Sequence, residues 1–249
     1  MDDFYDRLAP LYDLIFFDWD ASMEQQAGQL SAIIGEQWGA DVRSILDVAC
    51  GIGTQTIGLA RKGFVITGSD LSAGAVERAK VEARRRGVEI DFSVCDMRAA
   101  HDHHGREFDL VISCDNAIPH LLTDDEILMA FRQMHGCTRP GGGCLVTVRD
   151  YDREERGTGL VKPYGVRDRD GKRYVIFQVR DFSGDIYDLA MYFVVDDGGW
   201  QPKTHVMRSK YYPIGTGHLM ELMRRAGFAS VERLDGKFYQ PVLVGNREE

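Results

Sequence analysis

The stretch from Ser44 to Asp70 constrains the fold most. An apolar run ends in a Gly-x-Gly turn at Gly51 and Gly53, a helical pattern follows, and a second β-branched run ends in Asp70. The two glycines let the backbone turn sharply and approach a ligand without a Cβ in the way. Asp70 follows Gly51 by 19 residues, which is the spacing of a ribose-binding carboxylate. The stretch predicts a strand, a loop, a helix and a strand that open a doubly wound nucleotide-binding sheet.

Two positions separate the possible ligands of this loop. Thr56 stands where a dinucleotide-binding fingerprint has its third glycine. Asp47 precedes the loop, and a carboxylate there would repel a pyrophosphate but attract an ammonium or a sulfonium. The loop therefore favours a cationic, phosphate-free ligand.

The motif D-V-A-C-G-I-G with the downstream S-D-L-S resembles the class I (Rossmann-like) S-adenosylmethionine-dependent methyltransferases. The resemblance implies an α/β fold with a doubly wound seven-stranded mixed sheet, whose last strand is antiparallel, and helices on both faces. It implies S-adenosyl-L-methionine as the cofactor, with Asp96 at the adenine amino group and the next backbone N–H at a ring nitrogen. The implied cofactor-binding residues are Tyr5, Tyr12, Asp47, Ala49, Gly51, Gly53, Asp70, Leu71, Asp96, Met97 and Cys114.

The totals narrow the class of protein further. A net charge of −9 over 249 residues argues against a general nucleic-acid or membrane-surface binder, because phosphate contact needs a basic surface. Five scattered cysteines without a C-x-x-C pair predict reduced thiols in a cytoplasmic protein. Met1 leads into acidic residues, so no signal peptide is expected. No apolar run reaches the roughly 18 residues of a membrane-spanning helix.

The run His101-Asp102-His103-His104 is the one stretch that invites a metal-site interpretation. Its residues are adjacent, we expect them on a polar loop, and no further ligands follow at metal-site spacing. We therefore expect no metal.

The pattern along the chain predicts one domain over 1–249, with a helical lid over 1–38 and an inserted antiparallel cover over 152–213. Pro10 should split the start of the lid into two short pieces. Within the cover, alternation from Arg173 to Tyr212 predicts a three-stranded meander. The other expected strands are 44–50, 64–70, 90–95, 108–114, 144–149, 228–234 and 240–246. The expected helices are 23–38, 54–62, 73–86, 125–135 and 217–226, and 139–143 should be a turn.

The segments C-D-N-A-I-P-H-L, R-P-G-G-G-C-L-V-T-V-R-D-Y-D and S-K-Y-Y-P resemble the glycine N-methyltransferase branch. The resemblance implies that Arg149 and Asn116 grip an amino-acid substrate. Tyr151 and Tyr211 are the further catalytic candidates, since hydroxyls or aromatic faces could surround the methyl group. The branch has H-R-N-Y-D where this chain has V-R-D-Y-D, so the substrate stays open. Arg149 in an ordinary ion pair with Asp150 or another acid, and the tyrosines as packing, are the alternatives.

The sequence therefore predicts N-methylation of a small carboxylate-bearing amine, such as glycine or a related metabolite. A small-molecule O-methyltransferase and a non-catalytic S-adenosylmethionine-binding regulatory protein remain alternatives, and a dinucleotide-dependent oxidoreductase is disfavoured by Thr56 and Asp47. The expected partner is a small amine or acid, with neither nucleic acid nor membrane. The oligomeric state stays open, with a homodimer among the candidates.

Overall fold

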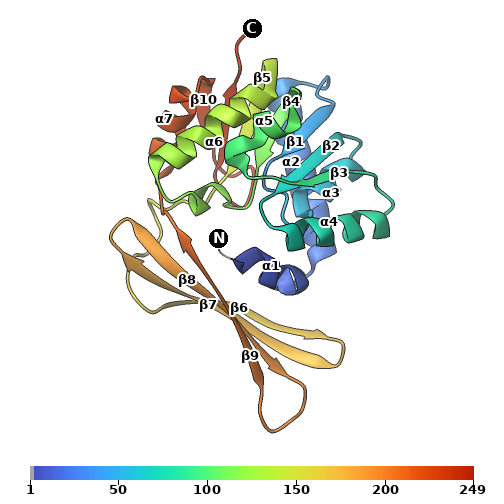
Figure 1. The fold of residues 1–249 in the computed structure, drawn as a ribbon, viewed down its shortest axis with the longest axis vertical. Helices are drawn as coiled ribbons and strands as arrows, with labels where there is room; N and C mark the ends of the chain where they lie inside the picture. Colours follow the sequence, from blue (N-terminus) through green and yellow to red (C-terminus); the bar gives the residue numbers. More distant parts are fainter. Residues whose placement is uncertain (1–2) are drawn as a thin grey trace.

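Two sheets organise the chain, of which the computed structural model describes residues 3–249 (Figure 1). Residues 1 and 2, where the predicted lid begins, lie outside the described residues. The larger sheet has seven strands in the order β10-β11-β5-β4-β1-β2-β3. These strands are β1 (Ser44–Asp47), β2 (Val65–Asp70), β3 (Asp91–Val94), β4 (Phe108–Ser113), β5 (Thr138–Thr147), β10 (Ala229–Leu234) and β11 (Val242–Asn246). The last strand, β11, runs antiparallel to both of its neighbours, β5 and β10, which confirms the predicted mixed sheet with an antiparallel last strand.

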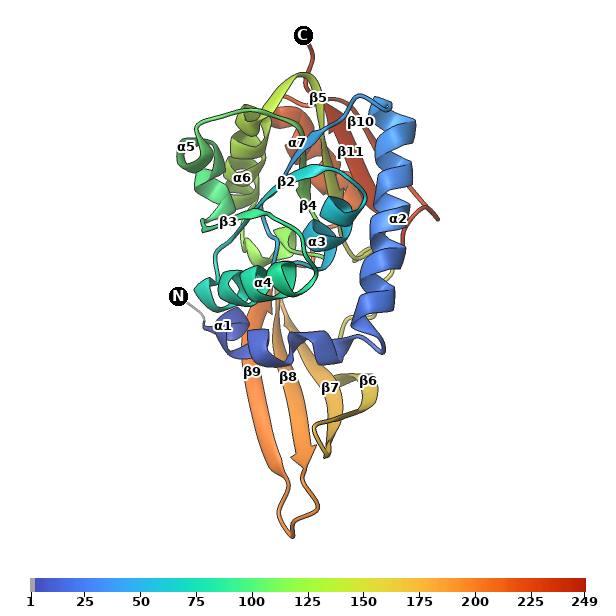
Figure 2. The same ribbon diagram turned by 90° about the vertical axis from the view of Figure 1, so that its right-hand side faces the viewer.

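Helices cover both faces of the larger sheet. On one face lie α2 (Trp19–Trp38), α3 (Thr54–Arg61) and α4 (Ala73–Arg85). On the other lie α5 (Ala100–His104), α6 (Asp124–Cys137) and α7 (Thr216–Arg225). Figure 2 shows α2 and α3 on one side of the strands and α5 and α6 on the other. The short 3₁₀ turns η2 (Met97–Ala99) and η3 (Ile118–His120) follow β3 and β4.

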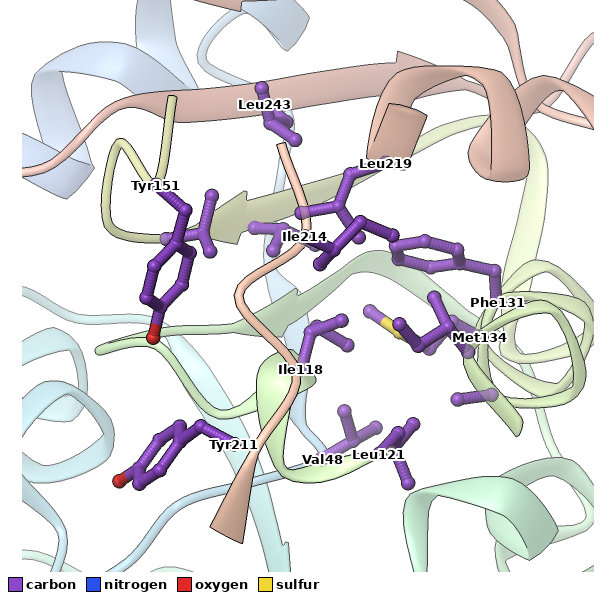
Figure 3. Close-up of a cluster of buried hydrophobic side chains, with 14 of the residues drawn as sticks. Val48, Ile118, Leu121, Phe131, Met134, Tyr151, Tyr211, Ile214, Leu219 and Leu243 are labelled. Atoms are coloured by element: carbon purple, nitrogen blue, oxygen red, sulfur yellow. The ribbon is translucent and has the colours of Figure 1, made fainter. Parts of the chain in front are cut away.

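Both faces of the central strands are buried, as expected for parallel strands between two helical layers. Successive side chains alternate between the faces, so that Leu46 packs in the cluster beneath α6 and α7 while Ile45 packs beneath α2. Figure 3 shows part of the first cluster, with Phe131 and Met134 of α6 against Leu219 of α7. Tyr151 and Tyr211 lie at one edge of this cluster, apart from the aliphatic side chains (Figure 3). The core therefore ends in aromatic hydroxyl groups on the side of the small sheet.

The N-terminal segment, which consists of α1 (Phe4–Leu8) and η1 (Ala9–Ile15), confirms the prediction of two short helical pieces around Pro10. It lies between the carboxyl ends of the large sheet's parallel strands and the small sheet (Figures 1 and 2). Helix α2 begins earlier than the predicted Met23, because the Asp18 side chain accepts a hydrogen bond from the backbone N–H of Ala21 at 2.9 Å and caps the first turn.

The small sheet corrects the predicted three-stranded meander, because it has four antiparallel strands. They are β6 (Leu160–Arg169), β7 (Lys172–Ser183), β8 (Ile186–Asp196) and β9 (Lys203–Tyr211), in that spatial order. The prediction missed β6 because Pro163 and Gly165 interrupt its alternation. Both are tolerated because β6 is an edge strand and its pairing with β7 shifts register between these two residues.

A second correction concerns the glycine-rich segment 139–143, which is the first half of β5 and not a turn. It is extended because it pairs with the C-terminal segment. The backbone N–H of Gly141 donates to the carbonyl of Arg247, and the backbone N–H of Arg247 donates to the carbonyl of Gly142. Gly143 is required for packing, since a Cβ there would lie 2.2 Å from the Trp38 ring.

Smaller corrections concern the ends of two strands and the segment 101–104. Strands β4 and β5 end at Ser113 and Thr147, so Cys114, Asn116 and Arg149 lie on the loops beyond them. Residues 101–104, expected on a loop, belong to α5. Within residues 3–249 no group of His, Cys, Asp and Glu side chains is arranged to hold a metal ion, and no described helix is long and apolar enough to cross a bilayer.

Candidate active site

The Gly-x-Gly loop is held to the end of β2 by Asp70. Gly51 and Gly53 have φ values of +53° and +95°, a region that favours glycine. One Asp70 oxygen, Oδ2, accepts a hydrogen bond from the backbone N–H of Gly51 at 2.8 Å. The other, Oδ1, accepts from the backbone N–H of Ser72 at 2.9 Å. Burial raises the pKa of Asp70 above its usual value. The Asp70 carboxylate is thus oriented by two backbone donors, and it lines the cavity over the loop that is described below.

Asp47 lies beneath the same loop and is fully buried. Its Oδ1 accepts from the backbone N–H of Ala49 at 3.1 Å, and its Oδ2 accepts from the Thr56 hydroxyl at 2.7 Å. Burial raises the pKa of Asp47 to about 7. Thr56, in the place of a third glycine, therefore satisfies a buried carboxylate that supports the loop from inside.

A first cavity of about 660 Å³ lies over this loop, at the carboxyl ends of β1 to β4. This volume is within the range of small-molecule sites. Nine of the eleven predicted cofactor residues line it: Tyr5, Tyr12, Ala49, Gly51, Asp70, Leu71, Asp96, Met97 and Cys114. The other two do not line the cavity: Asp47 lies under the loop, and Gly53 is the last glycine of the loop itself.

Asp96 follows β3 at the rim of the first cavity and is tied to Arg98. Its Oδ1 accepts from the Arg98 backbone N–H at 2.9 Å, and the Arg98 guanidinium lies 2.6 Å from Oδ2. Burial raises the pKa of Asp96, but the Arg98 bonds and charge outweigh it and hold the pKa below its usual value. Asp96 is therefore an ionised acceptor at this rim.

A second cavity, of about 530 Å³, opens beneath the N-terminal segment and the small sheet. Phe4, Tyr5, Tyr12 and Asp115 line both cavities, so the two adjoin at these residues. Two predicted catalytic residues, Arg149 and Tyr211, line the second cavity. The small sheet and the loop before β11 add residues that the sequence did not single out: Lys162, Tyr164, Gln178, Tyr239 and Gln240.

Arg149 carries a positive charge into the second cavity without an ion-pair partner among residues 3–249. Its Nη1 donates to the Tyr187 hydroxyl at 3.4 Å. The alternative pairing with Asp150 does not form, since Asp150 Oδ2 lies 2.7 Å from Arg233 of β10. A guanidinium within a cavity favours an anion there.

Asn116 and Tyr151 lie behind Arg149 and line neither cavity. Asn116 Oδ1 accepts from the backbone N–H of Arg149 at 3.0 Å, and its Nδ2 donates to the Tyr151 hydroxyl at 2.8 Å. That hydroxyl also lies 3.1 Å from the hydroxyl of Tyr187. These buried groups connect the ends of β4 and β5 and orient the backbone that carries Arg149.

Two further residues of the stretch after β4, Asp115 and His120, line the first cavity and were not predicted as site residues. His120 Nε2 lies 2.7 Å from the Tyr5 hydroxyl, and its Nδ1 lies 3.3 Å from the Ser209 hydroxyl. Burial, with a smaller effect of the Arg149 charge, lowers the pKa of His120 to about 3, so the ring is neutral at pH 7. Both residues belong to the segment C-D-N-A-I-P-H-L, whose resemblance to the glycine N-methyltransferase branch was the signal in the sequence that could have found them.

Comparisons with known proteins agree with this geometry. Residues 45–142 match the family described as "Methyltransferase domain". The chain is 29% identical to the glycine/sarcosine N-methyltransferase of Parasynechococcus marenigrum (strain WH8102), over 93% of this chain and 76% of that protein. It is 30% identical to the ubiquinone biosynthesis O-methyltransferase of Azoarcus sp. (strain BH72), over 43% of this chain and 44% of that protein. The crystal structure of Streptomyces venezuelae DesVI has the same fold, with a TM-score of 0.82 at 24% identity over 96% of this chain and 98% of that one.

The fold, the glycine loop with its acid-ended second strand and the domain match define the class of protein. Residues 45–142 match a methyltransferase domain, and together with the fold and the relatives this supports a class I S-adenosylmethionine-dependent methyltransferase. Its cofactor is S-adenosyl-L-methionine, and the residues present fit that cofactor, because two oriented carboxylates, Asp47 and Asp70, lie under and beside a loop with no basic side chain in it.

Proposed function

We propose that this methyltransferase methylates the nitrogen of a small amine that carries a carboxylate, such as glycine or a related metabolite. The observation that carries the proposal is Arg149, a cavity-lining guanidinium with no ion pair among the described residues, in the cavity that adjoins the cofactor's. A substrate carboxylate there gains two parallel charge-assisted hydrogen bonds.

In the proposed arrangement the first cavity holds the cofactor through the nine predicted residues that line it. The bound cofactor supplies an electrophilic methyl group on a sulfonium. The methyl group would pass to the lone pair of the acceptor's nitrogen, the electron pair of the C–S bond would stay on sulfur, and the methylated nitrogen would lose a proton to solvent. The chain's task is to hold the nitrogen in line with the methyl group, about 3 Å away, and to exclude water.

The residues divide this task between them. Arg149 binds the acceptor's carboxylate, while Asn116 and Tyr151 act as positioning residues through its backbone and through Tyr187. Tyr5 and Tyr12 of the N-terminal segment lie at the junction of the cavities, and Tyr211 of β9 lines the second cavity with its hydroxyl 3.5 Å from that of Tyr5. A neutral amine needs no general base, which agrees with a cavity whose histidine, His120, is already hydrogen-bonded at both nitrogens.

The comparisons support nitrogen over oxygen as the acceptor atom. The glycine/sarcosine N-methyltransferase matches 93% of this chain, a stretch too long to omit the small sheet. The O-methyltransferase matches 43% of this chain.

Calorimetric titration with S-adenosylhomocysteine, followed by a methylation assay on glycine, sarcosine, β-alanine and 4-aminobutyrate, tests the proposal. Arg149→Met should raise the KM of the accepted amine at least tenfold, since a hydrogen bond to a charged group contributes about 1.5–3 kcal/mol, and should leave the affinity for S-adenosylhomocysteine unchanged. Arg153→Met is the matched control, because that guanidinium is 84% exposed.

An Arg149→Met enzyme with an unchanged KM would contradict the proposed carboxylate contact. Tight binding of S-adenosylhomocysteine without turnover of any amine would favour the non-catalytic alternative.

A further inference from the structure

Asp115 lies where the two cavities meet, since it lines both. Its Oδ1 accepts a hydrogen bond from the Tyr239 hydroxyl at 2.6 Å and a longer one from Gln240 Nε2 at 3.4 Å. Among residues 3–249, no donor is bonded to its Oδ2. One oxygen of this carboxylate is therefore held by the protein and the other is available to a ligand.

The loop after β4 holds Asp115 in an unusual backbone conformation. Asp115 and Asn116 have consecutive positive φ values of +56° and +66°, which are uncommon outside glycine. The backbone N–H of Asp115 donates to the Thr147 hydroxyl at 2.8 Å, and that of Asn116 donates to the Thr147 carbonyl at 3.0 Å. The conformation is thus imposed from β5, and it points one side chain, Asp115, to the cavities and the next, Asn116, into the core.

The second cavity has charges of both signs. Arg149 and Lys162 are its cations, and the Lys162 pKa is lowered first by burial and then by the charges of Arg149 and Arg180. Asp115 lines the same cavity, and no ion pair joins it to another residue of 3–249. Two further residues of the lining, Asp150 and Gln240, have a buried acceptor, Oδ1 and Oε1 respectively, that finds no hydrogen-bond partner in the described part of the chain. Buried acceptors without donors are costly, so this side of the cavity suits a ligand that brings N–H groups.

We propose that Asp115 binds the amine nitrogen of the methyl acceptor through Oδ2. This inference rests on the proposed function, in which Arg149 holds the opposite, carboxylate end of the same molecule. The nitrogen would then lie at the junction, next to the cofactor cavity, and the pair Arg149 and Asp115 would select an amino acid over an amine or an acid alone. The bound ammonium would give one proton to solvent before its lone pair attacks, and a remaining N–H group would keep the bond to Oδ2. The second cavity, at about 530 Å³, has room for acceptors longer than glycine.

Matched ligand pairs test the two contacts separately. Protein saturated with S-adenosylhomocysteine is titrated with glycine and glycolate, β-alanine and 3-hydroxypropionate, 4-aminobutyrate and 4-hydroxybutyrate, and the carboxylate-free pair butylamine and butanol. The unchanged protein should prefer the amine of each pair. Asp115→Asn should weaken binding of the amines by at least about tenfold and leave the hydroxy acids within about twofold, because it removes a charge-assisted bond to nitrogen only.

Asp185→Asn, in the exposed turn between β7 and β8, is the matched control for the lost charge, and it should preserve the amine preference. If circular dichroism shows that Asp115→Asn does not fold, Asp115→Ser gives the same test. An amine preference that survives in the variant, or an equal loss for amines and hydroxy acids, would overturn the role of Asp115.

The proposed function fails separately from this inference. Arg149→Met should weaken both members of each carboxylate-bearing pair and leave butylamine unchanged. If Arg149→Met has no effect on any ligand, the carboxylate contact is wrong, while the comparison of butylamine with butanol still decides whether Asp115 binds the amine.

Discussion

At the scale of single residues, Asp47 explains how the loop differs from a dinucleotide-binding one. A third glycine would open the helix under a pyrophosphate, whereas Thr56 uses that position to donate a hydrogen bond to Asp47. The carboxylate is retained in a fully buried position, at a cost in desolvation that appears as its raised pKa.

This burial predicts a pH dependence of stability. Because the pKa of Asp47 is about 7 in the folded protein and about 3.9 in an unfolded chain, the folded state binds the proton more tightly. The stabilising contribution of protonated Asp47 to the free energy of unfolding is complete below about pH 4 and is lost as the pH rises through 7. The free energy of unfolding of the ligand-free protein, measured with urea, should fall by roughly 2 kcal/mol more between pH 5 and pH 8 than that of Asp47→Asn.

Asp41→Asn, in the exposed loop before β1, is the control, and it should keep the slope of the unchanged protein. Parallel pH profiles for Asp47→Asn and the unchanged protein would show that Asp47 is not the group that titrates.

At the scale of elements, the N-terminal segment joins the larger sheet's helices to the small sheet. On one side, Asp6 Oδ1 accepts from the Ser72 hydroxyl at 2.6 Å and from the Gly74 backbone N–H at 2.8 Å, at the first turn of α4. On the other side, Asp13 lies 3.1 Å from Arg169 of β6. The segment therefore depends on contacts with both α4 and β6 to keep Tyr5 and Tyr12 over the cavities.

The contacts of Asp6 predict an effect on cofactor affinity at a distance. Asp6→Ala removes two hydrogen bonds, worth about 0.5–1.5 kcal/mol each, that hold the segment over the first cavity. The dissociation constant for S-adenosylhomocysteine, measured by calorimetry, should rise by about fivefold or more. Asp3→Ala is the control in the same helix, because the Asp3 side chain makes no capping hydrogen bond. An unchanged affinity in Asp6→Ala would mean that the segment closes without this anchor.

At the scale of the whole molecule, the carboxyl ends of β1 to β5 bring residues distant in the sequence to one pair of adjoining cavities. Ligand binding there should stabilise the fold by mass action. At a concentration one hundred times its dissociation constant, S-adenosylhomocysteine should raise the free energy of unfolding by about 2.7 kcal/mol. In a chain of this size that corresponds to a rise in Tm of very roughly 5–10 °C.

Asp70→Ala should lose most of this rise, because it removes the carboxylate that holds Gly51, and Arg149→Met should keep it. NADH is the ligand control. An equal rise in Tm with NADH would contradict the preference that Thr56 and Asp47 predict.

Much of the fold followed from local patterns in the sequence. The parallel strands, the helices between them and the last two strands were predicted because their apolar periodicity is a local property. The errors have local causes as well: Pro163 and Gly165 disguised β6, and the glycines of 139–143 imitated a turn, although Gly143 is small because Trp38 packs on it.

By itself, the sequence determined the class of fold, the loop at Gly51 and the acid at Asp70, because loop chemistry and the succession of strands and helices along the chain depend on neighbouring residues. Only the tertiary structure decided which candidates face a cavity. Asn116 and Tyr151 lie behind Arg149, Asp47 lies under its loop, and Asp115 occupies the junction. The direction of a side chain on a loop depends on long-range hydrogen bonds, such as those from Asp115 and Asn116 to Thr147, and no local pattern in the sequence records them.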